Sequence, residues 1–187
     1  MNVSARPRLA LTYEDYRLLP EDGRRWELIG GDFHVSPAPT SQHQQVVAHL
    51  VFHLIGTLWK KRRAQVLASP IDVILDETNT VQPDVVVVKR EHRSIITRRG
   101  IVGVPDLVVE VVSPHKPSMD LVLKRHLYER FEVPEYWLID PDERTVTVLA
   151  RSGGAFVETL ALRGSGQIRS KVFPSLKLPL AELFAAL

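Results

Sequence analysis

Two short valine-rich runs, at residues 81–88 and 106–112, are the strongest hydrophobic pattern in the chain. Runs of this kind predict strands that are covered on both faces of a sheet. Two longer segments instead repeat apolar residues at the i, i+3, i+4 spacing of an amphipathic helix. The first runs from Ser41, the expected N-cap, to about residue 63, and the second covers residues 118–131.

Shorter segments complete the expected order of elements. Alternating patterns predict strands at residues 25–29, 32–36, 65–75 (bent at Pro70), 135–139, 145–149 and 156–160. Short helices are predicted near residues 13–19 and 180–184, a hairpin turn at Gly30-Gly31, and a charged connection over residues 91–103.

The spacing of these elements indicates the fold class. Residues 105–113, the helix that follows and residues 135–139 have the length of a βαβ crossover, which predicts two parallel strands. Hairpins on both sides make the sheet mixed. We therefore expect an α/β or α+β fold with a mixed central sheet flanked by helices. One domain should cover residues 1–187, with a core over about 12–161 and a C-terminal extension over 162–187.

Composition agrees with an ordinary globular protein. The chain has 187 residues, of which 44% are hydrophobic and 25% charged. It has no cysteine, which excludes disulfides, thiolate zinc sites and cysteine nucleophiles and fits a cytoplasmic location. No apolar stretch approaches the length of a membrane span, and we expect no secretion signal at the N-terminus.

The charge distribution is more informative than the net charge of +2. Basic residues gather in two groups: Lys60, Lys61, Arg62 and Arg63, and then Arg90, Arg93, Arg98 and Arg99. The first group has two interpretations of equal weight, which do not exclude each other. Its cations balance the negative end of a helix dipole, or they contact the phosphates of a nucleic acid.

Three charged residues occupy positions where the pattern expects apolar ones: Asp84, Glu110 and Lys124. If the two valine-rich strands pair with their faces aligned, alternation brings Asp84 and Glu110 together across the sheet. Lys124 falls inside the apolar arc of its helix, and Asp120 at the edge of that arc. Either Lys124 extends its amine past the sheet edge into water, or the amine points at the carboxylates.

Such a cluster has a definite chemistry. Two carboxylates around one point suit Mg²⁺ or Mn²⁺, which polarises a phosphodiester and lowers the pKa of a bound water. A lysine beside the ion orients that water or stabilises charge that develops on the phosphate. The competing interpretation is a buried ion pair that satisfies only itself.

Four runs of residues carry a resemblance to a known family: 26–31 (WELIGG), 82–84 (QPD), 105–114 (PDLVVEVVSP) and 134–141 (PEYWLIDP). With these runs the chain resembles the Uma-type family of restriction-endonuclease-like proteins in the PD-(D/E)XK nuclease superfamily. The resemblance extends from about Thr12 to the C-terminus.

The resemblance implies a restriction-endonuclease-like core and a set of site residues. Asp84 and Glu110 match the motif acids and would be metal ligands, with Glu27 as an assisting upstream glutamate. The superfamily pattern has a lysine two positions after the acid, where this chain has Val112. The resemblance implies that Lys124, from the following helix, takes that place.

Four further residues have two open interpretations. His43, Gln82, Asp120 and Tyr128 either support the site or pack as ordinary core and strand-end residues.

The leading hypothesis is a nuclease that hydrolyses DNA with Mg²⁺ or Mn²⁺, whose basic groups hold the nucleic-acid backbone without selecting sequence. We expect a homodimer or a higher homo-oligomer. The alternative is a non-catalytic module that binds nucleic acid or protein and has a structural acid–lysine cluster.

Overall fold

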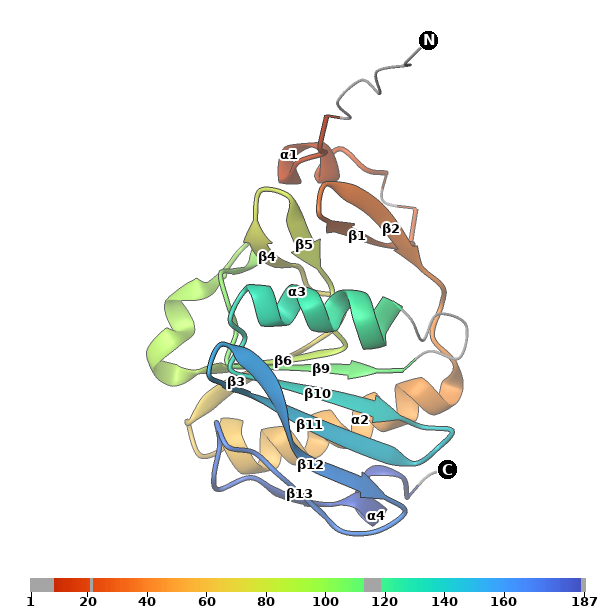
Figure 1. Ribbon diagram of the computed structural model, residues 1–187, viewed down its shortest axis with the longest axis vertical. Helices are drawn as coiled ribbons and strands as arrows, with labels where there is room; N and C mark the ends of the chain where they lie inside the picture. Colours follow the sequence, from red (N-terminus) through yellow and green to blue (C-terminus); the bar gives the residue numbers. More distant parts are fainter. Residues whose placement is uncertain (1–8, 21, 113–118, 186–187) are drawn as a thin grey trace.

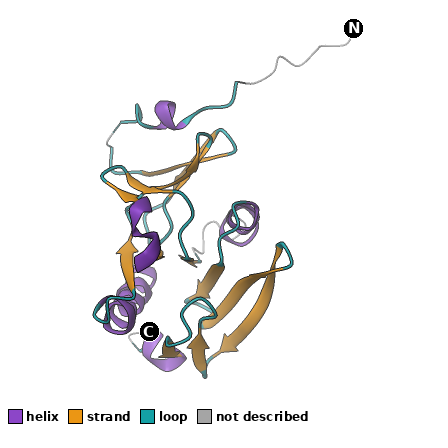
Figure 2. Ribbon diagram, turned by 90° about the vertical axis from the view of Figure 1, so that its left-hand side faces the viewer, coloured by secondary structure: helices purple, strands orange, loops and turns teal. Residues whose placement is uncertain are grey.

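The computed structural model describes residues 9–20, 22–112 and 119–185. Within these residues, most strands belong to two mixed sheets of six strands each. Figure 1 shows the first sheet, called sheet A, in the upper part of the molecule and the second, sheet B, in the lower part. In the side view of Figure 2 the two sheets are separate groups of strands. The predicted mixed sheet flanked by helices is therefore confirmed, with a second sheet added to it.

Sheet B is the central sheet of the prediction. Its strands, in spatial order, are β12 (Ala155–Arg163), β11 (Thr145–Ser152), β10 (Glu135–Asp140), β9 (Leu107–Val111), β6 (Val85–Lys89) and β3 (Ala64–Ala68). Strands β9 and β10 are parallel, as the crossover length predicts, and the other pairs are antiparallel.

Sheet A is built from short strands. In spatial order they are β2 (Asp32–Ser36), β1 (Arg25–Ile29), β5 (Asn79–Val81), β4 (Val73–Asp76), β8 (Gly100–Val102) and β7 (Ile96–Thr97). The predicted turn between β1 and β2 is present, and Gly30 and Gly31 have φ angles of 60° and 79° there. Glycine adopts such left-handed angles without the steric cost of a Cβ atom.

The helices cover the faces of sheet B. Helix α2 (Ser41–Leu54) and the π-helical segment η1 (Ile55–Trp59) pack on one face, while the π-helical segment η3 (Met119–Lys124) and α3 (Arg125–Arg130) lie on the other (Figure 1). The short elements are α1 (Tyr13–Tyr16), the 3₁₀ helix η2 (Arg90–Ile95), α4 (Leu180–Leu183) and the pair β13 (Gln167–Arg169) and β14 (Lys177–Pro179).

Two helix boundaries differ from the prediction. The N-cap of α2 is Thr40 and not Ser41, because the Thr40 hydroxyl accepts a hydrogen bond from the backbone N–H of His43. The helix continues from α2 through η1 and ends at Trp59, and not at about residue 63, shortly before Arg62, which takes a left-handed φ of 54°. The predicted start of the second helix, at residue 118, lies outside the described residues.

Two predicted strands are each divided between the sheets. The segment predicted as one bent strand over residues 65–75 forms β3 in sheet B and then β4 in sheet A. The valine-rich run over residues 81–88 likewise ends β5 in sheet A and continues as β6 in sheet B. Pro70 and Pro83 stand at the two breaks, and a proline has no N–H to donate to a strand ladder. Asp84 therefore lies at a crossing between the sheets.

The predicted connection over residues 91–103 also contains regular structure, since η2 and the β7–β8 hairpin occupy it. Neither element has enough alternation to be recognised from its sequence, because each has only two to six residues.

The apolar residues form two cores on opposite faces of sheet B. Alternate residues of β6 and β9, including Val85, Val87 and Val109, pack with α2 and the C-terminal elements. Their neighbours Val86 and Val108 pack on the other face with α3 and sheet A. Both faces of the valine-rich strands are thus covered, as their composition predicts.

Candidate active site

The pairing of β6 with β9 sets the two acids opposite each other. The antiparallel register pairs Val85 with Val109 and Val86 with Val108. One step further along the same register, Asp84 lies opposite Glu110. The contact is direct at this end of the strands, because Asp84 Oδ2 accepts a hydrogen bond of 2.8 Å from the backbone N–H of Val111.

Lys124 reaches this point from the last turn of η3. Its Nζ lies 2.9 Å from Glu27 Oε1 and 3.0 Å from Glu110 Oε1, and its side chain is 2% exposed. The amine therefore points at the carboxylates and not past the sheet edge into water. Tyr128, one turn later on α3, donates a 2.7 Å hydrogen bond to Glu110 Oε1. Burial, and then the nearby Glu110 charge, raise the pKa of the Tyr128 hydroxyl well above its ordinary value.

Asp84 has two basic side chains on its other side. Arg25 Nη1 lies 3.0 Å from Asp84 Oδ1, and His43 Nε2 lies 3.2 Å from the same oxygen. Burial by itself would raise the pKa of Asp84, but His43, Arg25 and Lys124 outweigh it and lower that pKa to about 2. Burial would lower the pKa of Arg25, but the charges of Asp84, Glu110 and Glu27 together outweigh this and raise it. Asp84 is therefore a stable anion.

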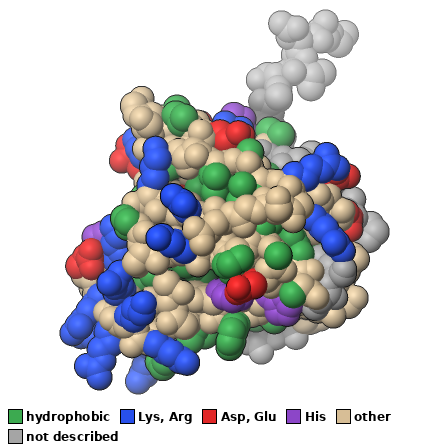
Figure 3. Space-filling model, turned by 90° about the horizontal axis from the view of Figure 1, so that it is seen from below, with side chains coloured by type: hydrophobic (Ala, Val, Ile, Leu, Met, Phe, Trp, Pro, Cys, Tyr) green, Lys and Arg blue, Asp and Glu red, His purple; other side chains and the backbone are tan. Residues whose placement is uncertain are grey.

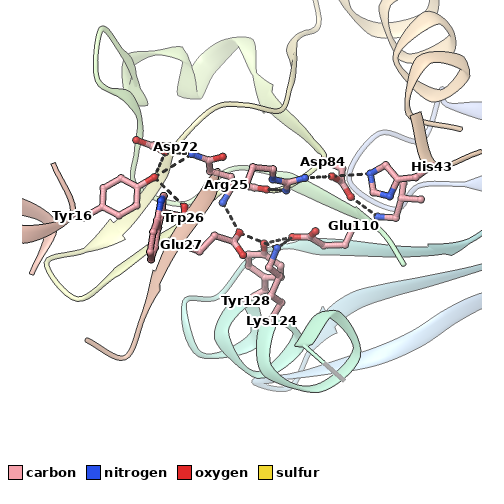
Figure 4. A network of polar contacts seen from close by, with 12 residues as sticks. Tyr16, Arg25, Trp26, Glu27, His43, Asp72, Asp84, Glu110, Lys124 and Tyr128 are labelled. Carbon is pink, nitrogen blue, oxygen red and sulfur yellow. Dashed lines mark hydrogen bonds and ion pairs between the residues drawn. The ribbon is translucent and has the colours of Figure 1, made fainter. Parts of the chain in front are cut away.

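A second layer of polar contacts holds Glu27. Its side chain is fully buried, and Oε1 accepts a 2.7 Å hydrogen bond from the backbone N–H of Gln82. The Gln82 amide in turn donates to Asp72 Oδ1 at 2.9 Å and to the Tyr16 hydroxyl oxygen at 3.1 Å. The Tyr16 hydroxyl donates to Asp72 Oδ1 at 2.8 Å. Figure 4 shows this chain of contacts running from Tyr16 to the acid cluster.

Most of the expected site residues come together here. The structure brings to one place Glu27, His43, Gln82, Asp84, Glu110, Lys124 and Tyr128. Asp120 lies in η3, and its side chain is outside the part of the chain that the structure describes. Arg25 was not among the predicted site residues, although it lies on the same strand face as Glu27 and this alternation was a usable signal. Tyr16 and Asp72 had no such signal.

The cluster has the right donors for a hard cation but not a preformed set of them. Among the described residues, no three His, Asp or Glu side chains are grouped so as to hold a metal ion. Glu27 Oε2, however, is a buried carboxylate oxygen with no hydrogen-bond partner in that part of the chain. Carboxylate oxygens are the ligands that Mg²⁺ and Mn²⁺ prefer. The donors therefore fit such an ion, which would have to share or replace contacts made by Lys124 and Arg25.

Solvent reaches the cluster from the side of Asp84. A cavity of about 520 Å³ opens beside it, and Arg25 and Gln82 line the same cavity. Glu27, Glu110 and Lys124 lie deeper, each at most 2% exposed. A ligand that enters from solvent therefore meets Asp84 and Arg25 first.

The basic residues divide into separate places. A cavity of about 500 Å³ is lined by Lys60, Arg62, Arg90 and Arg93. Another of about 320 Å³ is lined by Arg62, Arg63 and Arg90. Arg98 and Arg99 line a hollow of about 370 Å³ that also includes Asp72 and Gln82. Lys61 is exposed. Only the Arg98–Arg99 pair therefore lies beside the acid cluster.

Across residues 9–20, 22–112 and 119–185, no helix has the length and apolar character needed to cross a membrane.

Comparison with known proteins identifies the fold and the family of this chain. No curated protein matches the chain. Among solved structures, the crystal structure of a "putative nuclease belonging to DUF820" from Anabaena variabilis superposes with a TM-score of 0.77 at 23% sequence identity. The match covers 94% of this chain and 98% of that one, and it shows the same fold. The family model Uma2, described as "Putative restriction endonuclease", matches residues 13–181. The chain belongs to this restriction-endonuclease-like family, as the resemblance of its motifs predicts.

Proposed function

We propose that this protein is a divalent-metal-dependent nuclease that hydrolyses phosphodiester bonds in DNA. The observation that carries the proposal is the buried cluster in which the Lys124 amine contacts Glu27 and Glu110, with Asp84 opposite Glu110 just before strand β6. Burial of this many charges costs several kcal/mol per ion before their mutual attraction offsets it. Clusters of this kind occur at active sites more often than where stability alone is needed. Family membership supports the same reaction class.

The carboxylates have a clear division of labour in this proposal. Asp84 and Glu110 would hold Mg²⁺ or Mn²⁺, and the unpartnered Oε2 of Glu27 would contribute a further oxygen. When bound, the ion supplies Lewis-acid polarisation of the phosphodiester and a more acidic water.

The remaining groups act on the phosphate and on the ligands. Lys124 stabilises the negative charge that develops on the phosphate oxygens, and Tyr128 orients Glu110 through its 2.7 Å hydrogen bond. Arg25, at the mouth of the cavity, binds an incoming phosphate oxygen. Hydrolysis forms one P–O bond to the attacking water and breaks one ester P–O bond, whose leaving oxygen takes up a proton.

A cleavage assay tests this proposal. Duplex, single-stranded and branched DNA and an RNA are incubated with the purified protein and Mg²⁺ or Mn²⁺. We expect metal-dependent cleavage that falls at least a hundredfold in Asp84→Asn and Glu110→Gln. Asp142→Asn, at an exposed turn, is the matched control and should keep full activity. If the Asp84→Asn and Lys124→Ala proteins both cleave as fast as the unaltered protein, the assignment of these residues to catalysis is wrong.

A second candidate function has its own supporting observation. Every acid of the cluster already has a cationic neighbour, since Lys124 contacts Glu27 and Glu110 while Arg25 contacts Asp84. This balance favours a non-catalytic module that binds nucleic acid or protein and uses the cluster for structure. Absence of Mn²⁺ binding by calorimetry, together with absence of cleavage, would select this candidate over the first.

We further propose that the protein is cytoplasmic, folds as one domain over residues 1–187 and forms a homodimer or a higher homo-oligomer. Light scattering coupled to gel filtration measures the mass of the assembly directly.

A further inference from the structure

Trp59 is an exposed aromatic residue in a basic setting. Its side chain is 50% exposed at the end of η1, although tryptophan is on average one of the most buried residue types. It lines the cavity of about 500 Å³ together with Lys60, Arg62, Arg90 and Arg93. No residue in the described lining of this cavity is acidic. The cavity therefore combines a flat apolar surface with a concentration of positive charge.

The backbone explains how the two basic groups meet at this cavity. Arg62, in its left-handed conformation, donates its N–H to the Trp59 carbonyl at 2.8 Å, and Arg63 donates to the Leu58 carbonyl at 2.9 Å. These bonds cap two carbonyls at the end of the helix. Arg90 then donates its N–H to the Arg63 carbonyl at 3.0 Å, which ties the start of η2 to the helix end. Seen from below, Lys and Arg side chains gather toward one end of the molecule (Figure 3).

This basic cavity and the acid cluster lie at opposite ends of the same strands. Strand β6 begins next to Asp84 and ends at Lys89, next to Arg90. The paired edge strand β3 runs from Ala64, which lines the basic cavity, toward Ser69, which lines the cavity beside Asp84. A five-residue strand has a length of about 17 Å. This is about the length of five nucleotides at the B-form rise of about 3.4 Å per nucleotide.

We propose that the Trp59 cavity holds an unpaired nucleotide of the nucleic-acid substrate, with its base stacked on the Trp59 ring and its phosphates on the surrounding Lys and Arg side chains. The bound nucleotide lies about 17 Å, the length of a five-residue strand, from the phosphate at Asp84. The inference rests on the proposed nuclease function and specifies its substrate class as a strand with a single-stranded segment. The reason is geometric: a base exposes its face to an aromatic ring only when it is unstacked.

Binding measured without catalysis tests this site. Fluorescence anisotropy follows a labelled 12-nucleotide oligo(dT), alone and as a duplex with oligo(dA), binding to the full chain in EDTA. We expect the single strand to bind more tightly than the duplex. Trp59→Ala should weaken single-strand binding about tenfold, whereas Trp59→Phe should retain most of it.

Arg90→Ala and Arg93→Ala should weaken single-strand binding and lower its salt dependence, by about 0.7 in the log–log slope for each lost phosphate contact. Lys177→Ala, an exposed cation on β14, is the matched control and should bind as the unaltered protein does. Circular dichroism confirms that each variant is folded.

The outcomes separate this inference from the proposed function. If Trp59→Ala binds the single strand as tightly as the unaltered protein, or loses single-strand and duplex binding equally, the assignment of Trp59 is wrong. If the expected binding pattern holds in EDTA but no nucleic acid is cleaved with Mg²⁺ or Mn²⁺, the nuclease proposal fails and the binding site stands.

Discussion

Replacement of Lys124 by methionine tests the energetics of the acid cluster directly. The side chain is 2% exposed, and its amine lies 2.9 Å from Glu27 Oε1 and 3.0 Å from Glu110 Oε1. Methionine keeps most of the volume but leaves both buried carboxylates without this cation. In this variant the Gln82 backbone N–H still donates to Glu27, and the Tyr128 hydroxyl still donates to Glu110.

Loss of one partner from a buried charge pair costs about 3–5 kcal/mol of unfolding free energy. In a domain of this size each kcal/mol lowers the Tm by about 2–4 °C, so we expect Lys124→Met to lower it by about 6–20 °C. Urea denaturation followed by circular dichroism gives the free energy, and calorimetry gives the Tm. Lys177→Met is the exposed control, for which a change within about 0.5 kcal/mol is expected.

A double mutant distinguishes lost charge balance from altered packing. Glu110→Gln removes one of the two carboxylates that lose the Lys124 amine in Lys124→Met. The double variant should therefore be more stable than the sum of the single effects, by about 0.5–3 kcal/mol. Two results would refute the reasoning that Lys124 balances these carboxylates. One is strict additivity of the single effects in the double variant, and the other is a Lys124→Met protein whose free energy of unfolding is within about 1 kcal/mol of the unaltered protein's.

Three further predictions address the rest of the structure. The pKa of Asp84 falls from 3.8 to about 2 on folding, so the ionised carboxylate adds about 2 kcal/mol to the free energy of unfolding above pH 4, and this contribution is lost as the pH falls through 2. Urea titrations at several pH values should show this loss, and the Asp84→Asn protein should not show it. Tyr16→Phe removes the hydroxyl that contacts Asp72 and Gln82 and should lower the unfolding free energy by about 1–3 kcal/mol, with an effect near zero in denaturation experiments arguing against this network. Leu54→Ala, at a fully buried position of α2, should lower the free energy of unfolding by about 2–5 kcal/mol. A decrease of less than about 1 kcal/mol in chemical denaturation would contradict the packing described for that core.

The sequence was sufficient for the parts of this protein that depend on local pattern. Valine-rich runs identified β6 and β9 as strands covered on both faces, and the crossover length made β9 and β10 parallel. Helical periodicity placed Lys124 on the buried side of its helix, where the structure has it. Each of these results follows from side-chain period or segment length, which are properties of neighbouring residues.

Only the tertiary structure decided how distant segments meet. The breaks at Pro70 and Pro83 each divide one chain segment between the two sheets, and no periodicity of the residues shows which sheet a short strand joins. The pairing of Arg25 with Asp84 joins residues 59 positions apart, and the Tyr16–Asp72 contact joins residues 56 apart. The sequence alone therefore determined which residues are unusual, because a charge in an apolar pattern is a local fact. Which cation balances which acid, and how far the basic cavity lies from the acid cluster, depended on strand register and sheet order, which are set by packing between distant segments.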